Sequence, residues 1–503
     1  NKAMEIIERE ATSLREWIVL PGFTREKCTA DKVNLEQTIC GIYFRFPLMP
    51  ASMSCLYYGK KDELALVASK EGMPPVIHYN QPVDDQVGII KKIKKEKKKA
   101  NGLIELLDNP VRASNNATLA FVLNLAKKYG YSVIPIVEMP DSLLFPAERL
   151  HYFHGVFIRP FYSPEQDKEM LVTELPEPLY YSKEKLEVGK EGMSEAEINA
   201  KIEKLKEEKG QHFLPLIDEK GRLKWLAFKR KFPNYFCGAA IHTYEGWQER
   251  VEACIDAGAD FIVIDTSDGF SEFEAKVAKE FKSRYRKPLI GGNIVTAEAF
   301  DYLKEYVDMI KVGMMTGASC KTGAVKNIGR PLFEALLEIK KARDLHYKKT
   351  GKYIPIIADG GVNSVLEMTV ALALADLVMA GYYFAQFYES AGEAFDQNRK
   401  IARREEEITY KEYWGEGSAK ARNIARYGHK TPKTALEEGV YGLIPYRGRL
   451  RPCIEEDMKA LKATLANVGA LNLVEYREKA RLQRLSKIGA EERNPRSSVI
   501  NRI

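Results

Sequence analysis

Eight short apolar runs, each ending at or beside a small or polar residue, constrain the fold of this chain more than any other feature of its sequence. Longer segments with apolar residues at three- and four-residue spacing separate most of them, which is typical of repeated strand–helix units on a parallel sheet. Eight such units close a (β/α)8 barrel. We therefore predict an α/β fold, a TIM barrel, with strands at 45–52, 74–80, 236–241, 260–265, 288–293, 309–314, 354–361 and 377–383.

The segments between the later runs have a clear helical period. Their apolar residues recur on one face, as expected for helices that cover a barrel. We predict helices at 246–257, 272–285, 297–306, 332–347 and 365–374.

The gap of about 155 residues between the second and third runs is far too long for a strand–helix connection. Within it, helical segments at 115–130 and 194–210 are each followed by two apolar runs, which indicates a tandem module of two helix-plus-hairpin units. A segment rich in Pro and Glu, 175–181, is the predicted boundary between them. The predicted domains are therefore 1–100 (first part of the barrel), 101–230 (the insert) and 231–503 (second part of the barrel with a flap and a C-terminal segment).

Composition places the chain among globular proteins and limits its partners. Lys and Arg number 77 against 70 Asp and Glu in 503 residues, a net charge of +7. On so long a chain this excess is mild and does not point to a nucleic-acid partner. The basic stretch 91–100 lacks interleaved aromatic residues and is better explained as the solvated face of a barrel helix than as a nucleic-acid patch. No apolar run is long enough for a membrane span and the N-terminus is charged, so we predict a cytoplasmic protein without a membrane partner.

The seven cysteines are scattered and never form a C-x-x-C pair, so we expect reduced thiols and neither a disulfide framework nor a zinc ribbon. Cys320 differs from the others because it lies among small residues in the loop after the sixth run. Such a loop can present a thiolate to a substrate, and the nearby hydroxyl of Thr322 can assist proton transfer. We interpret Cys320 as the one functional cysteine.

In a barrel of this type the active site lies at the C-terminal ends of the strands, and phosphate is often held after strands seven and eight. Gly360, Gly361 and Gly381 fall there and would let backbone N–H groups approach an anion, although they could also merely relieve turn strain. No G-x-G-x-x-G motif follows a strand, so a dinucleotide would bind without a Rossmann domain. We call this placement of the active site at the C-terminal ends of the strands the strand-end rule. By this rule the other candidate site residues are Ser52, Met53, His78, Asn80, Asp265, Asn293, the loop 313–322 and Asp359.

A long polar segment, 406–448, follows the eighth run and has too many glycines and charges for a single helix. We predict a mobile flap there. The flap contains Arg426 beside Tyr427, and its tyrosines, glycines and acidic residues are suited to a ligand wall.

At this point the residues resemble a known family, the IMP dehydrogenase and GMP reductase group. The resemblance covers roughly residues 10–100 and 230–450, and the inserted block resembles the tandem CBS (Bateman) module that the family carries at the same position. It implies NAD and potassium as cofactors, an adenine or guanine nucleotide effector at the insert, and a tetramer or octamer. The strings that carry it, in family order, are FCGAAI, DFIVIDTSDGFS, IGGNIVT, KVGMMTGASCKT followed by NIGRP, IADGG, VMAG, ESAGE, YWGEGS, ARY and EEGVYG.

The resemblance implies a covalent mechanism that oxidises IMP to XMP for guanine nucleotide biosynthesis. Cys320 would attack C2 of the purine, and hydride would leave to NAD. Water would then hydrolyse the thioimidate. Thr322 would assist proton movements at the thiol, and Arg426 beside Tyr427 would activate the water.

The binding residues are implied in the same way, with Asp359 on the ribose, glycines and a tyrosine on the phosphate, and Glu438 on the purine edge. The implied substrate-binding residues are Met53, Ser319, Asp359, Gly360, Gly361, Gly381, Tyr413, Gly415, Glu416, Gly417 and Glu438. Those implied for NAD are Asp265, Thr266, Ser267, Asn293 and Gly313. Gly317 and Cys320 are implied for a monovalent cation.

The chain also departs from the family pattern. Ala318 and Tyr382 stand where serines usually contact the phosphate, Ser52-Met53-Ser54 replaces Pro-Met-Asp, and Met315 replaces a glycine that supplies a cation ligand. These changes motivate one alternative, a divergent homologue that senses nucleotides with altered or lost activity. The other alternative is GMP reductase, which shares the cysteine and threonine but normally needs no hydrolytic flap.

Overall fold

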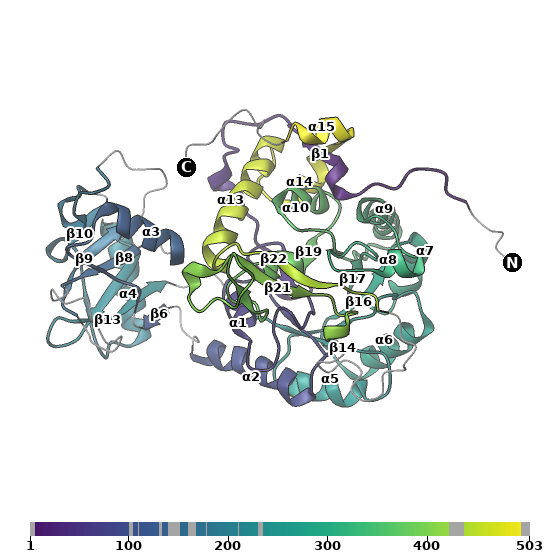
Figure 1. Cartoon of the computed structure of the whole chain (residues 1–503), viewed down its shortest axis with the longest axis horizontal. Helices are drawn as coiled ribbons and strands as arrows, with labels where there is room; N and C mark the ends of the chain where they lie inside the picture. The colour runs from purple at the N-terminus through teal and green to yellow at the C-terminus, as the bar shows by residue number, and fades with distance from the viewer. Residues whose placement is uncertain are drawn as a thin grey trace. The chain divides into compact units, whose positions relative to one another are not determined.

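The computed structural model describes residues 6–99, 104–108, 110–129, 133–138, 151–158, 167–177, 179–209, 211–229, 235–421 and 437–493 (Figure 1). The chain divides into two compact units. One comprises residues 1–94, 234–450 and 456–503, and the other comprises residues 95–233 and 451–455. Among the described residues, no helix combines the length and the apolar character that crossing a membrane requires.

The first unit contains a nearly closed, eight-stranded parallel barrel, and every predicted strand is present in it. Each strand pairs in parallel with its neighbours, in the order β4-β19-β18-β17-β16-β15-β14-β5. The predicted TIM barrel is therefore confirmed. The strands are β4 (Leu48–Pro50), β5 (Val76–Ile77), β14 (Gly238–Ile241), β15 (Phe261–Ile264), β16 (Leu289–Ile294), β17 (Met309–Val312), β18 (Ile356–Asp359) and β19 (Leu377–Ala380).

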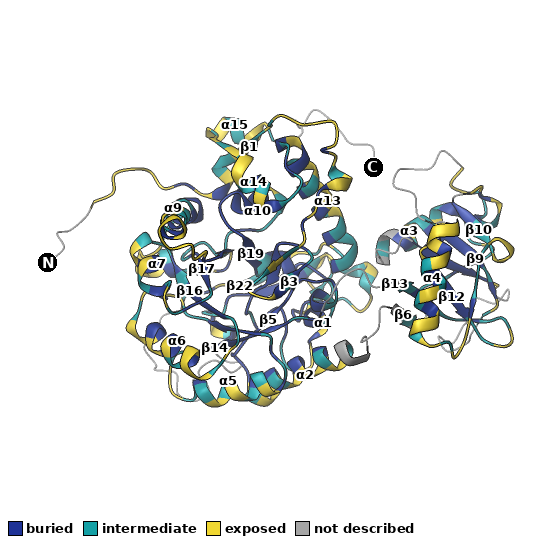
Figure 2. Cartoon of the chain, turned by 180° about the vertical axis from the view of Figure 1, so that it is seen from behind, coloured by how far each residue is buried: buried dark blue, intermediate teal, exposed yellow. Residues whose placement is uncertain are grey.

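The strands are apolar throughout because helices cover their outer face and side chains fill the barrel inside. Every residue of β14, β15, β17 and β19 is buried. Figure 2 shows this as dark blue strands inside helices that have one buried and one exposed face. Lys311 in β17 and Asp359 at the end of β18 are the charged exceptions, and both belong to the site described below.

All five predicted barrel helices form, with ends that differ by up to three residues. Side-chain oxygens of Ser271, Thr296 and Ser364 accept hydrogen bonds from first-turn backbone N–H groups, which explains where three of these helices begin. The helices around the barrel are α1 (Glu63–Lys70), α2 (Val83–Lys99), α5 (Trp247–Asp256), α6 (Glu272–Arg284), α7 (Ala297–Leu303), α8 (Thr322–Lys326), α9 (Leu332–Thr350), α10 (Val365–Leu372) and α11 (Tyr382–Ala385).

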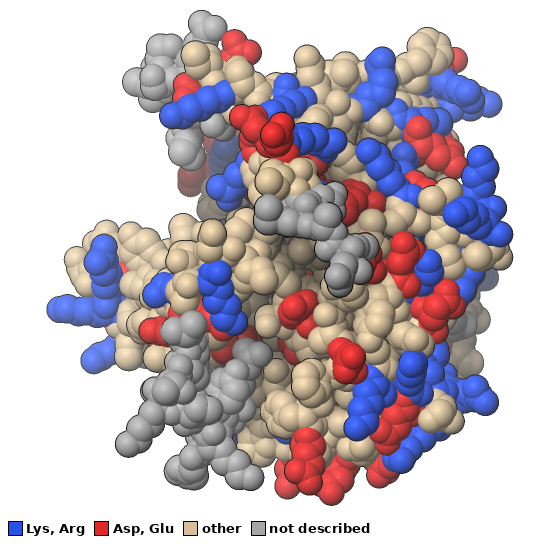
Figure 3. Space-filling view, turned by 90° about the vertical axis from the view of Figure 1, so that its right-hand side faces the viewer, with Lys and Arg blue, Asp and Glu red and all other residues tan. Residues whose placement is uncertain are grey.

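The basic stretch ends helix α2 as predicted, and part of its charge is paired inside the barrel unit. Lys92 lies 2.6 Å from Asp62, and Lys94 lies 2.5 Å from Asp260. On the face shown in Figure 3, the basic and acidic side chains of the described residues are interspersed.

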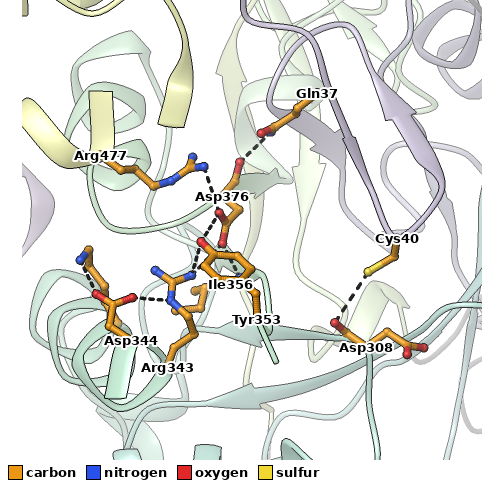
Figure 4. Close-up of polar contacts among 10 residues, drawn as sticks. Gln37, Cys40, Asp308, Arg343, Asp344, Tyr353, Ile356, Asp376 and Arg477 are labelled. Atoms are coloured by element: carbon orange, nitrogen blue, oxygen red, sulfur yellow. Dashed lines mark hydrogen bonds and ion pairs between the residues drawn. The ribbon is translucent and has the colours of Figure 1, made fainter. Parts of the chain in front are cut away.

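A buried ionic cluster joins several elements at the N-terminal end of the barrel strands (Figure 4). The Asp376 carboxylate accepts hydrogen bonds from Arg343 at 3.1 Å, the Tyr353 hydroxyl at 2.7 Å and the Ile356 backbone N–H at 2.8 Å. Arg477 of the C-terminal segment lies 3.3 Å from the same carboxylate. Groups at this end of a barrel contribute to stability, and the cluster attaches the C-terminal segment to the barrel.

Short elements from both ends of the chain complete the first unit. Strand β1 pairs antiparallel with β23, and β2 pairs with β3. The elements are η1 (Leu14–Glu16), β1 (Trp17–Leu20), η2 (Ala30–Lys32), β2 (Gln37–Ile39), β3 (Ile42–Phe44), α13 (Leu450–Val468), α14 (Leu473–Lys479), β23 (Arg481–Arg484) and α15 (Lys487–Glu491).

Part of the predicted flap, residues 406–448, forms strands of an antiparallel sheet that was not predicted from the sequence. Its strands are β20 (Ala394–Phe395), β21 (Tyr410–Trp414) and β22 (Tyr441–Pro445), with the turn η5 (Glu405–Glu407) and the short helix α12 (Ala419–Ala421) beside them. Strand β21 is buried at Tyr413 and Trp414, and this burial stabilises regular structure in spite of the polar composition. Residues 422–436 lie outside the described part of the chain.

The second unit contains two four-stranded sheets, each with one long helix, where the two helix-plus-hairpin units were predicted. The strand order is β10-β9-β8-β7 in one sheet and β11-β12-β13-β6 in the other. Strand β6, the first of the unit in sequence, therefore lies at the edge of the sheet formed by the last strands. The elements are β6 (Ile104–Asp108), β7 (Ala113–Ser114), α3 (Leu119–Tyr129), β8 (Val133–Val137), β9 (Phe153–Ile158), η3 (Val172–Glu174), β10 (Tyr180–Ser182), η4 (Lys183–Lys185), β11 (Gly189–Lys190), α4 (Glu195–Lys209), β12 (Phe213–Ile217) and β13 (Leu223–Lys229).

Candidate active site

A cavity of about 290 Å³ opens at the C-terminal ends of the barrel strands, where the strand-end rule placed the site. Loops after six barrel strands form its wall, together with the end of β21 and the start of the segment that leads into β22. The predicted residues on the wall are Met53, Asp265, Thr266, Ser267, Asn293, Gly317, Ser319, Cys320, Thr322, Asp359, Gly360, Gly361, Gly381, Tyr413, Gly415, Glu416, Gly417 and Glu438.

Cys320 lies on this wall and is exposed, and its thiol belongs to a chain of hydrogen bonds. Its Sγ lies 3.2 Å from the hydroxyl oxygen of Thr322, and that hydroxyl donates to Glu438 at 3.0 Å. Lys326 of α8 lies 2.6 Å from the other oxygen of Glu438. The arrangement holds a nucleophile next to groups that can receive its proton.

Backbone bonds shape the loop that carries the thiol. The Cys320 N–H donates to the carbonyl of Gly317 at 2.9 Å. Met315 adopts a φ of 80°, in the left-handed region that favours glycine, so this position of the loop is strained with a methionine. Gly313 has a φ of 149°, and a Cβ atom there would lie 1.9 Å from the carbonyl oxygen of Asp359, so only glycine fits.

Small residues and two tyrosines line one end of the cavity, the predicted phosphate seat. Gly360 and Gly361 have φ values of 88° and 69°, conformations in which successive backbone N–H groups can face an anion. The ring of Tyr382 stands edge-on to Tyr413, with the centroids 5.5 Å apart. The Ser319 hydroxyl donates to the Tyr413 hydroxyl at 3.2 Å.

A buried ion cluster supports the wall on the side predicted for the nicotinamide. Lys311 is fully buried in β17, and its ammonium lies 2.7 Å from Asp265 and 3.9 Å from Asp359. Burial alone would lower the pKa of Lys311, but the two carboxylates outweigh it and raise that pKa. Asn293 donates to Asp359 at 2.9 Å and to the Gly313 carbonyl at 2.8 Å.

Glu274 of α6 lies behind the same wall and is fully buried. It accepts hydrogen bonds from the Thr266 hydroxyl at 2.6 Å and from the Gly292 backbone N–H at 2.5 Å. Burial raises the pKa of Glu274 to about 7 in spite of these two donors. This carboxyl therefore changes charge near neutral pH while in contact with a cavity residue.

Glu416 joins the loop at the end of β21 to two barrel strands. One carboxylate oxygen accepts from the backbone N–H and the hydroxyl of Ser54, both at 2.5 Å, and the other accepts from the Asn80 amide at 3.0 Å. The Trp414 indole N–H donates to the same Ser54 hydroxyl at 2.8 Å.

Several predicted site residues are not on the described wall. Gly313 lies behind it, where its carbonyl accepts from Asn293. His78 and Asn80 are buried beside Tyr57 and Glu416, to which they are bonded. Arg426 and Tyr427 lie outside the described residues. Sequence reasoning missed Lys311 and Glu274. A lysine inside the apolar run MIKVGM was a usable signal for Lys311, whereas Glu274 has the spacing of an ordinary polar residue in a helix.

The described residues hold no group of three or more His, Cys, Asp or Glu that could bind a metal ion. The cation predicted at Gly317 and Cys320 stays a prediction. The carbonyl of Gly317 accepts a hydrogen bond from the Cys320 N–H.

The chain is similar to known proteins over almost its whole length. The model of the IMP dehydrogenase / GMP reductase domain family matches residues 11–496. Inosine-5'-monophosphate dehydrogenase of Tritrichomonas foetus is 29% identical over 513 residues, which cover 95% of this chain and 94% of that protein. The enzyme of the same name from Aquifex aeolicus is 30% identical over 486 residues, covering 92% and 90%.

The fold is also similar to that of a solved GMP reductase. A structure of that enzyme from Trypanosoma brucei in complex with guanosine 5'-monophosphate superposes with a TM-score of 0.65 at 19% sequence identity. The match covers 97% of this chain and 98% of that chain.

Proposed function

Because the chain belongs to the IMP dehydrogenase / GMP reductase family, a family of oxidoreductases, we propose that it oxidises IMP to XMP with NAD through a cysteine thioimidate. The observation that carries this proposal is the line from the Cys320 thiol through Thr322 to Glu438 at the wall of the barrel cavity. The overall reaction consumes IMP, NAD⁺ and water and yields XMP, NADH and a proton.

The first step forms a bond between Cys320 Sγ and C2 of the purine. The thiol proton is passed toward the Thr322 hydroxyl, which is within hydrogen-bond distance of the sulfur and itself donates to Glu438. Nicotinamide, when bound, supplies a hydride acceptor for the hydrogen of C2. Water then adds to C2 and the C2–S bond breaks, which returns the thiol and releases XMP.

The donors and acceptors on the wall fit both ligands chemically. Asp359 can accept from ribose hydroxyls, and the glycine turn at 360–361 can donate to phosphate. Asp265, Ser267 and Asn293 provide carboxylate, hydroxyl and amide groups for a nicotinamide nucleotide on the opposite part of the wall. The Lys311 ammonium, 2.7 Å from Asp265 and 3.9 Å from Asp359, orients both carboxylates for this purpose.

The dehydrogenase is favoured over GMP reductase by the sequence of the segment between β21 and β22. It contains Arg426 and Tyr427, to which we assign activation of the hydrolytic water. The two relatives described above, both named IMP dehydrogenases, support the same choice. The fold similarity to a GMP reductase is the observation that keeps the reductase as a second candidate.

We also propose that the second unit is a tandem CBS module that binds an adenine or guanine nucleotide. Two four-stranded sheets in tandem, each with a helix, support this assignment. A potassium ion at the cysteine loop, a tetrameric or octameric assembly and a cytoplasmic location stay predictions.

One assay distinguishes the candidates. Purified protein is given IMP with NAD, and separately GMP with NADPH, while nicotinamide absorbance is followed. We expect NADH only with IMP, no reaction in Cys320→Ala, and accumulation of covalent intermediate in Arg426→Ala. Consumption of NADPH with GMP would establish the reductase instead, and silence in both would favour a nucleotide-sensing homologue.

A further inference from the structure

We propose that the Glu416 carboxylate is a positioning residue that fixes the peptide units of the 415–418 loop against the nucleotide, and so determines nucleotide affinity rather than the rate of hydride transfer. This inference rests on the proposed function of the cavity. Glu416 would act through the loop it holds and not through the reacting atoms.

The carboxylate has a donor from each of two barrel strands. Ser54 follows β4 and donates its backbone N–H and its hydroxyl to one oxygen, and Asn80 follows β5 and donates its amide to the other. Ser54 and Asn80 are buried, at 0% and 2% exposure, so these bonds are shielded from water. Hydrogen bonds from buried donors to a charged acceptor are the strong ones, and losing the acceptor leaves those donors unsatisfied.

Further hydrogen bonds hold the same loop on both sides of Glu416. Asn80 also donates to the carbonyl of Ala421 at 3.1 Å, and the Trp414 indole donates to the Ser54 hydroxyl. Residues on both sides of Glu416 are therefore bonded to the same pair of barrel residues. The loop cannot shift without breaking bonds in the interior.

From this anchored loop, backbone bonds continue to the catalytic cysteine. The Glu438 N–H donates to the carbonyl of Gly417 at 3.1 Å, and the Lys321 N–H donates to the carbonyl of Glu438 at 2.8 Å. Glu438 also receives the Thr322 hydroxyl bond. A continuous series of hydrogen bonds therefore connects strands β4 and β5, through Glu416 and Glu438, to the cysteine loop.

Loss of the Glu416 carboxylate should affect ligand binding and the reactivity of the thiol differently. Gly415 and Gly417 lie on the cavity wall beside Glu416, so displacement of their peptide units weakens ligand binding directly. The cysteine loop has supports outside this series of hydrogen bonds, namely the Gly317 turn and the bridge between Met314 and Arg330, so the thiol should keep most of its reactivity.

The test compares Glu416→Met, which has similar length but no acceptor, with Glu416→Gln, which keeps one acceptor oxygen for Ser54. We expect Glu416→Met to raise the KM for IMP at least about tenfold and to change kcat by less than about threefold, with the KM for NAD unaltered. Glu416→Gln should fall between Met and the native residue. Glu393→Met is the matched control, because the Glu393 side chain is exposed and pairs with Lys61 at the surface.

Trp414 gives a readout that does not need turnover. Its emission, isolated by subtracting the spectrum of Trp414→Phe, should shift in Glu416→Met, shift less in Glu416→Gln, and not shift in the control. If native protein does not oxidise IMP, the proposed function fails, and this spectral series still tests the positioning role. Unchanged Trp414 emission, or a loss confined to kcat, would overturn the inference.

Discussion

The Sγ atom of Cys320 lies 3.2 Å from the hydroxyl oxygen of Thr322, and no residue other than Lys321 separates the two in the sequence. The hydroxyl is in turn bonded to Glu438, 116 positions further along the chain. A proton can therefore leave the sulfur along a short path that ends at a carboxylate stabilised by Lys326.

Thr322→Val removes this path while keeping the size and branching of the side chain. We expect kcat for NADH formation to fall about 100-fold, since a positioned proton-transfer group typically contributes at least that factor. The KM for IMP should change little because the hydroxyl is directed at sulfur and carboxylate. Thr350→Val at the C-terminal end of α9, far from the cavity, is the control, and an unchanged kcat in Thr322→Val would contradict the role.

Tyr382 carries a hydroxyl on the cavity wall that makes no hydrogen bond to another described residue. We expect this hydroxyl to contact the phosphate in place of a lost serine. Tyr382→Phe should raise the KM for IMP about tenfold, the cost of one hydrogen bond to a charged group, and should leave binding of inosine unchanged. Tighter binding of IMP in the variant would mean that the ring occupies phosphate space instead.

Glu274 should make stability depend on pH. The folded pKa of Glu274 is about 7 against an ordinary value of 4.5, so between these pH values the folded chain binds more protons than the unfolded chain. Its contribution to the free energy of unfolding is therefore present below pH 4.5, falls as pH rises, and is lost above about 7. Glu274→Gln stays neutral and should not show this loss.

Urea unfolding at pH 5 and pH 8 checks this expectation. Glu274→Gln should be about 2 to 3 kcal/mol more stable than the native protein at pH 8 and equal to it at pH 5. The Thr266 hydroxyl can then donate to the Gly292 carbonyl, 3.1 Å away, and accept from the glutamine. The exposed Glu305→Gln should change neither value, and a variant equal to native at pH 8 would show that Glu274 is not protonated by burial.

The fold could be predicted from the sequence because barrel strands are buried on both faces and stand out as apolar runs. Most wall residues followed, because parallel strands bring their C-terminal ends to one place. The bond between Ser54 and Glu416 could not be predicted, since it joins residues 362 positions apart that carry ordinary polar signals. The sheet at β21 was missed for a related reason: Tyr413 and Trp414 are buried by distant parts of the chain, and local composition suggested a flap.

The buried position of Lys311 leads to a further prediction, which concerns the free energy of unfolding and not the rate of the reaction. The Lys311 ammonium is fully buried and lies 2.7 Å from Asp265 and 3.9 Å from Asp359, so Lys311→Met would leave these two largely buried carboxylates of the cavity wall without their counter-charge. Breaking a buried pair in this way typically costs about 3 to 5 kcal/mol. The exposed Lys459→Met, whose partner Glu456 is 3.7 Å away, should cost less than about 1 kcal/mol.

The pH dependence of this loss identifies its cause. Without Lys311, the pKa of Asp359, which burial already raises, should rise further, so protonation relieves the unpaired charge at low pH. Lys311→Met should therefore be more destabilised at pH 8 than at pH 5 in urea unfolding, and adding Asp265→Asn should recover part of the stability. An equal loss at both pH values, or no recovery in the double variant, would mean that the lysine stem contributes by packing and not by charge.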